Sequence, residues 1–130
     1  MRYLGIDFGS KRVGIALSDD SNSFAFPHTV LLNSDNLIGE IKKICIDNDV
    51  TEIVVGESRN FEQEENNIMK EVRPFVRELQ KINGKPVHLH PEFLSSLEAK
   101  QLQGKNNMLD ASAAAIILKS FLDTRNNKIL

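Results

Sequence analysis

The chain has 130 residues, the size of one domain, and 41% of them are hydrophobic, which is ordinary for a globular protein with a buried core. No apolar run approaches the roughly 20 residues that a membrane helix needs. The first residues also lack the long apolar stretch of a signal peptide. We therefore expect one domain over residues 1–130, placed in the cytoplasm and without a membrane partner.

The net charge of −2 does not suggest a broad basic surface for nucleic acid. It does not exclude a metal-dependent nuclease, because such a site clusters acidic residues and bound cations reverse the local charge. The single cysteine, Cys45, cannot form an internal disulfide and lies in the apolar run Ile44–Ile46. We expect a buried structural thiol there, in a reducing compartment.

Three apolar runs at the start of the chain predict an antiparallel meander. Arg2–Phe8 is followed after a short connection by Val13–Leu17, an arrangement typical of a hairpin. The third run, Phe24–Leu32, contains Pro27. Proline has no backbone donor, so this run is expected to be an edge strand.

The rest of the chain alternates between helical and strand patterns. Pro74 is expected to kink the second helix or mark its start, and Gly84 to end it. The elements predicted in chain order are a helix over Leu37–Cys45 capped by Ser34 or Asp35, a strand over Thr51–Gly56, a helix over Ile68–Ile82, a strand over Pro86–Leu89, a helix over Leu94–Leu102 and a last helix over Met108–Asp123 capped by Asn107. Strands that alternate with helices imply parallel pairing, so we predict an α/β fold with a mixed five-stranded sheet.

Asp7 is the most unusual residue of the predicted sheet, because it closes an apolar strand just before Phe8-Gly9-Ser10. A carboxylate there costs free energy unless it is paired or binds a cation. Capping of the following turn by its own side chain explains the position equally well. From its position alone, Asp7 is either a functional or a structural carboxylate.

Two further acids could join Asp7. Asp110 shares a helix face with Ala114, Ile117 and Phe121, which predicts a place on the buried side of the last helix, although acids also favour helix N-termini. Glu92 follows the strand that precedes it and, taken alone, is more simply a solvated loop acid. The three carboxylates can converge at one edge of the sheet. Such oxygen ligands suit Mg²⁺ or Mn²⁺, and two such ions about 4 Å apart can assist phosphodiester cleavage.

Cations and histidines supply weaker candidates. Lys11 and Arg12 follow Asp7 closely and could bind a substrate phosphate, although exposed turn residues are the simpler interpretation of each. Arg59 is a weaker candidate of the same kind, as are Lys100 and Lys105. His88 and His90 have the spacing of a zinc-binding pair on one strand face, but two histidines do not complete a typical site, which favours ordinary strand residues.

Several segments together resemble one known family. The run from Asp7 to Asp19, with the sequence Asp-Phe-Gly-Ser-Lys-Arg-Val-Gly-Ile-Ala-Leu-Ser-Asp, closely resembles the opening motif of the YqgF family, whose members are proposed pre-16S rRNA nucleases or Holliday junction resolvases. Ile53–Gly56 resembles the family's central strand, Leu94–Ala99 its Leu-Thr-Thr-Val-Glu-Ala segment, and Leu109–Leu118 its last helix. The resemblance implies an RNase H-like fold and an acidic triad at Asp7, Glu92 and Asp110. It also implies trimming of the 5′ end of the small-subunit rRNA precursor, with branched DNA as another substrate.

The chain departs from the family at two places. Pro91-Glu92-Phe93 stands where the family usually has Asp-Glu-Arg, so the glutamate remains without its charged neighbours. Gly56–Asn60 replaces the family's Gly-Leu-Pro-Leu-Asn, and Arg59 within it could take the place of the missing arginine. These changes leave the metal triad in place and alter the surroundings of Glu92.

The leading hypothesis is a phosphodiesterase that uses Mg²⁺ or Mn²⁺ on structured RNA. Asp7, Glu92 and Asp110 would hold the metal, and Lys11, Arg12 and Arg59 would bind substrate phosphate. The alternatives are a Holliday junction resolvase acting as a homodimer, a non-catalytic RNA-binding assembly factor, and an actin-like phosphotransferase. The last requires two such domains where 130 residues supply one.

Overall fold

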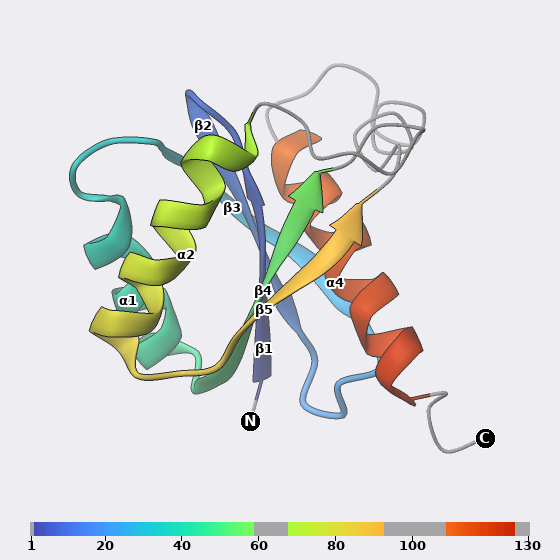
Figure 1. The fold of residues 1–130 in the computed structure, drawn as a ribbon. Coiled ribbons are helices and arrows are strands. Elements are labelled where there is room, and N and C mark those ends of the chain that lie inside the picture. Colours follow the sequence, from blue (N-terminus) through green and yellow to red (C-terminus); the bar gives the residue numbers. More distant parts are fainter. Residues whose placement is uncertain (1, 59–67, 93–108, 127–130) are drawn as a thin grey trace.

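The five strands form one mixed sheet in the spatial order β3-β2-β1-β4-β5 (Figure 1). The computed structural model describes residues 2–58, 68–92 and 109–126. Its strands are β1 (Arg2–Phe8), β2 (Arg12–Ser18), β3 (Ala25–Leu32), β4 (Val50–Ser58) and β5 (Val87–Glu92). The first three pair antiparallel, and β4 and β5 join them in parallel. This confirms the predicted meander with two added parallel strands.

Helices α1 (Leu37–Asp47) and α2 (Met69–Asn83) cover one face of the sheet, and α4 (Leu109–Asn126) covers the other (Figure 1). The strands divide their side chains between the two faces with the expected period of two. In β1, Leu4 and Ile6 belong to the core beneath α1 and α2, whereas Tyr3 belongs to the core beneath α4. None of the helices in the described ranges has the length and apolarity needed to cross a membrane.

Helix α4 lies close to the sheet at its N-terminal half, where its contact surface contains small residues. The side chains of Ala111, Ser112, Ala113, Ala114 and Ala115 are all buried. The strands below provide glycines: a Cβ atom built on Gly5 would lie 2.8 Å from Cβ of Leu118. The small-residue run of this helix therefore packs on the sheet.

Cys45 lies in α1 and is 2% exposed, in agreement with a structural thiol. Burial raises the pKa of this thiol to about 11, which keeps it protonated and unreactive near neutral pH.

Some element boundaries differ from the prediction. β5 runs on through Glu92 because it pairs with β4 as far as Ser58, so Glu92 ends a strand and does not lie in a loop after it. The residue that precedes α1 is Asn36, and it makes no side-chain capping bond. The hydroxyl oxygen of Ser34 accepts the backbone N–H of Asn36 at 3.3 Å, so Ser34, one of the two predicted caps, satisfies a backbone donor just before the helix. The segments predicted as a helix over Leu94–Leu102 and as the cap Asn107 lie outside the described residues.

Pro74 lies inside α2, five residues after its first residue, so it does not mark the start of that helix. Gly84 ends α2 as predicted. Its φ of 63° is left-handed, a conformation that glycine adopts without a steric penalty.

Candidate active site

Asp7 and Asp110 come together where α4 begins against the sheet. Asp7 pairs with Gly14 of the neighbouring strand, and both positions belong to the sheet face that α4 covers. A Cβ atom on Gly14 would overlap the carbonyl oxygen of Asp110. The backbone of Asp110 therefore lies directly on the strand pair that carries Asp7. Both carboxylates are half-buried.

Glu92 lies at the same end of the sheet. The carboxyl ends of β4 and β5 and the start of α4 are all at the upper end in Figure 1. Glu92 is the last residue of β5 and pairs in register with Ser58. It follows His90 by two positions, and the His90 ring contacts α4. The side chain of Glu92 is outside the described part of the structure.

Arg12 is the phosphate-binding candidate that the structure places at the site. Its Nε lies 3.4 Å from Oδ2 of Asp110, and its side chain is 63% exposed. A pair this exposed contributes little to stability, so the guanidinium remains available to a ligand. Lys11 is exposed beside it in the β1–β2 connection. Arg59, Lys100 and Lys105 fall outside the described residues.

The donor chemistry of the site fits a hard divalent cation. Asp7 and Asp110 offer carboxylate oxygens from one face of the sheet, and such oxygens are the ligands that Mg²⁺ and Mn²⁺ prefer. Among the side chains that the structure describes, no three metal-ligating residues form a cluster, and Glu92 is not among those side chains. Asp7 and Asp110 are two of the three residues that the sequence predicted to hold the metal.

A second polar cluster on the same sheet face was not predicted as a unit. Oε1 of Glu52 lies 2.8 Å from Nε2 of His88 and 3.3 Å from Nη1 of Arg125. Burial acts to raise the pKa of Glu52, but hydrogen bonds from His88, Tyr3 and Arg125 outweigh it and lower the pKa. Burial also lowers the pKa of His90 and favours its neutral form. The spacing of the two histidines predicted that they share one face of a strand. The side chains that they contact belong to β4 and α4, which the spacing does not predict.

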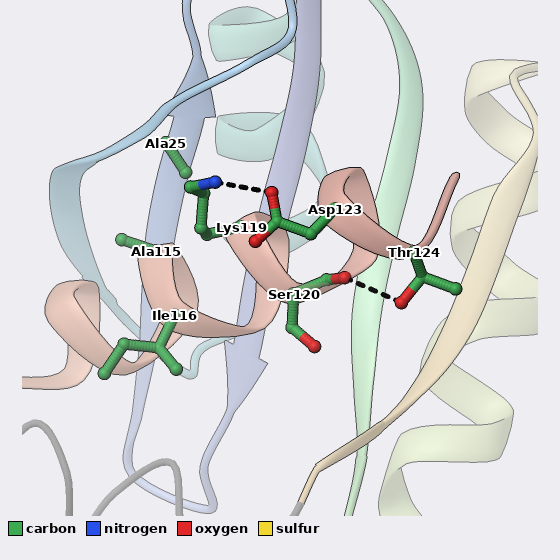
Figure 2. Close-up of a pocket in the computed structure, with 7 residues that line it drawn as sticks. All are labelled: Ala25, Ala115, Ile116, Lys119, Ser120, Asp123 and Thr124. Carbon is green, nitrogen blue, oxygen red and sulfur yellow. Dashed lines mark hydrogen bonds and ion pairs between the residues drawn. The ribbon is translucent and has the colours of Figure 1, made fainter. Parts of the chain in front are cut away.

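A cavity between β3 and the middle of α4 has the wrong chemistry for an active site. Figure 2 shows the seven residues that line it: Ala25, Ala115, Ile116, Lys119, Ser120, Asp123 and Thr124. Lys119 pairs with Asp123, and the hydroxyl of Thr124 donates to the carbonyl of Ser120, so these polar groups satisfy one another along the helix. Neither Asp7 nor Asp110 contributes to this cavity.

The arrangement of the sheet and helices defines a RuvC-like RNase H fold. The structure resembles "T. thermophilus RuvC in complex with Holliday junction substrate" with a TM-score of 0.63 and 16% identity, over 98% of this chain and 97% of that one. The fowlpox virus resolvase in complex with Holliday junction DNA matches with a TM-score of 0.59 and 9% identity, over 96% of this chain and 99% of that one. At these identities the likeness shows the fold, and it confirms the RNase H-like prediction.

Sequence comparison identifies the family within that fold. The family model described as "RuvX: Holliday junction resolvase" matches residues 1–124. Relatives named "Putative pre-16S rRNA nuclease" include those of Maridesulfovibrio salexigens, 35% identical over 94% of this chain and 98% of the relative, and of Lawsonia intracellularis, 38% identical over 95% and 94%. The chain belongs to the RuvX family, which is the YqgF family that its opening motif indicated.

Proposed function

We propose that this protein is a metal-dependent nuclease that hydrolyses phosphodiester bonds at the 5′ end of pre-16S rRNA during ribosome biogenesis. The observation that carries the proposal is the convergence of Asp7 and Asp110 at the end of the central strand. The names of the relatives support the choice of RNA substrate. We further propose that residues 1–130 act as one nuclease domain in the cytoplasm, as a monomer or homodimer.

In this proposal Asp7, Glu92 and Asp110 hold Mg²⁺ or Mn²⁺. The bound ion supplies charge stabilisation for the scissile phosphate and activation of the attacking water. Glu92 has the strand parity of His88 and His90, which agrees with a place on the face of Asp7 and Asp110.

The cations near the metal ligands would bind the substrate. Arg12 already places its guanidinium beside Asp110, from which it can reach a phosphate that approaches the two carboxylates. Lys11 adds a second positive charge next to it, and Arg59 is proposed as a third. The role of these residues is to orient the phosphate and to offset its charge.

The decisive experiment compares cleavage of a labelled pre-16S rRNA fragment and a four-way DNA junction. Each is incubated with Mn²⁺ or Mg²⁺, with EDTA, and with the variant Asp7→Asn. The matched control is Asp47→Asn, which removes an exposed carboxylate from α1 on the opposite sheet face. We expect RNA cleavage that requires the metal, falls at least 100-fold in Asp7→Asn as an order-of-magnitude estimate for loss of an essential electrostatic group, and is unchanged in Asp47→Asn.

The description of the family model favours a second candidate, a Holliday junction resolvase that cuts branched DNA as a homodimer. Selective cleavage of the junction would establish it and reject the RNA nuclease. Binding of RNA without any product would instead support a non-catalytic assembly factor, with Pro91 and Phe93 beside Glu92 as the first positions to restore to the family pattern.

A further inference from the structure

A cavity of about 570 Å³ lies on the α4 side of the edge strand β5. Its lining residues are His88, His90, Phe121, Thr124 and Arg125, from β5 and the last turns of α4. Helix α4 packs mainly on β1, β2 and β3, which leaves this side of β5 accessible. The volume is within the range that binds a ligand of nucleotide size.

The walls of the cavity combine aromatic rings with a guanidinium group. The His88 ring lies 5.1 Å from that of Phe121 at an interplanar angle of 30°, and the His90 ring meets Phe121 edge-on at 5.7 Å. Cζ of Arg125 lies 6.0 Å from the centre of the Phe121 ring. Aromatic faces beside an arginine are the chemistry with which proteins bind unpaired nucleotides.

These side chains are held in place before any ligand arrives. Glu52 contacts both His88 and Arg125, and Nε2 of His90 lies 2.9 Å from the hydroxyl of Ser120. The Arg125 side chain is nevertheless 49% exposed, so a phosphate can reach it. A preorganised wall loses less conformational entropy on binding.

The cavity shares a sheet face with the candidate active site. Along β5, His88 and Glu92 are four residues apart, or about 13 Å at 3.3 Å per residue. Along α4, Arg125 is fifteen residues beyond Asp110, or about 22 Å at 1.5 Å per residue. A strand whose scissile phosphate lies at the carboxylates can therefore reach the cavity with a nucleotide a few positions along the strand. We propose that this cavity binds an unpaired nucleotide of the substrate strand, with its base against the His88–Phe121 rings and a phosphate at Arg125. The inference rests on the proposed nuclease function.

The test measures binding of a short fluorescent single-stranded RNA in EDTA, so that cleavage does not enter. Arg125→Gln is compared with Lys119→Gln, which removes the same charge from α4 but lines the cavity of Figure 2. We expect Arg125→Gln to weaken binding about 5-fold or more, on the scale of one lost nucleotide contact. It should also lower the salt-dependence slope by about 0.7, the value for one phosphate on a single strand. Lys119→Gln should change affinity less than about 2-fold on the same scale.

A direct readout is the NMR signal of the histidine rings. The RNA is expected to shift the ring signals of His88 and His90 and to leave that of His28, an exposed residue of β3, unchanged. Equal losses in the two variants, or unshifted His88 and His90 signals, would overturn the inference. Circular dichroism and thermal melting verify that both variants fold.

The two proposals can fail separately. Metal-dependent cleavage together with Arg125-independent binding would reject the nucleotide cavity and leave the nuclease intact. Arg125-dependent binding without cleavage by the wild-type protein would support the cavity and reject the nuclease.

Discussion

Gly14 determines how closely α4 approaches the strand that carries Asp7. Any side chain at this position would overlap the backbone of Asp110. Glycine is needed at position 14 because it has no side chain. Its backbone conformation does not require glycine, since among the described residues Gly84 is the glycine with a positive φ. The missing Cβ of Gly14 lets the backbone of Asp110 lie on the strand pair that carries Asp7.

Gly14→Ala is expected to push the start of α4 away from the sheet. We expect a loss of about 1–3 kcal/mol in the free energy of unfolding, as for other overpacked sites, and reduced cleavage because Asp110 moves relative to Asp7. Urea unfolding and the cleavage assay measure the two effects.

The matched control is Gly39→Ala in α1, where an added Cβ meets nothing within 4 Å. This change should stabilise the protein by about 0.5–1 kcal/mol, because alanine is the better helix former. Equal unfolding midpoints for Gly14→Ala and the wild type would contradict the proposed role of Gly14.

At the scale of elements, α2 shows how tertiary packing overrides a local signal. The helix continues through Pro74 although proline lacks the backbone donor of a helix interior. Its buried side chains, including Met69 and Val72 before the proline and Leu79 after it, belong to one core with β1 and β4. Because these apolar side chains are buried both before and after Pro74 in the sequence, tertiary packing stabilises the helix across the proline.

Pro74→Ala is therefore expected to stabilise the protein. Alanine restores the backbone hydrogen bond that proline cannot make and removes the clash of its ring, which stabilises the folded helix by up to about 3 kcal/mol. The unfolded chain becomes more flexible without proline, which lowers the stability by about 0.4–1 kcal/mol. Because Pro74 is exposed, no core contact is lost. Thermal melting should show a higher Tm, and a lower one would contradict this account. Arg77→Ala, at another exposed position of α2, should change stability by less than about 0.5 kcal/mol.

At the scale of the whole molecule, the candidate site depends on elements far apart in the sequence. Asp7 lies in the first strand, and Asp110 lies in the last helix. An ion held between them would bind the folded protein and not the unfolded chain, so binding would stabilise the fold.

Mn²⁺ is accordingly expected to raise the Tm of the wild-type protein. The stabilisation should reach about 2.7 kcal/mol at a metal concentration of 100 times Kd, and EDTA should reverse it. Asp47→Asn should respond like the wild type, whereas Asp7→Asn should show a much smaller shift. A wild-type Tm that does not change when Mn²⁺ is added would argue against the metal site.

The sequence alone determined the order and type of the elements in the described parts of the chain. Apolar residues recur every second position in β1 and every three or four positions in α1 and α2. These local periodicities show which side of each element faces the core. The edge position of β3 followed from Pro27. Asp7 and Asp110 were recognisable because each places a charge on an otherwise apolar face, and the opening motif supplied the family.

Only the tertiary structure decided how distant side chains meet. The approach of Asp110 to Gly14, the Arg12–Asp110 pair and the extension of β5 to Glu92 depend on neighbours in space. The contact between Glu52 and Arg125 joins residues 73 positions apart, which no local pattern predicts. The physical reason is that periodicity encodes which face of an element is buried, whereas the partner on that face is set by the packing of the sheet and the helices against each other.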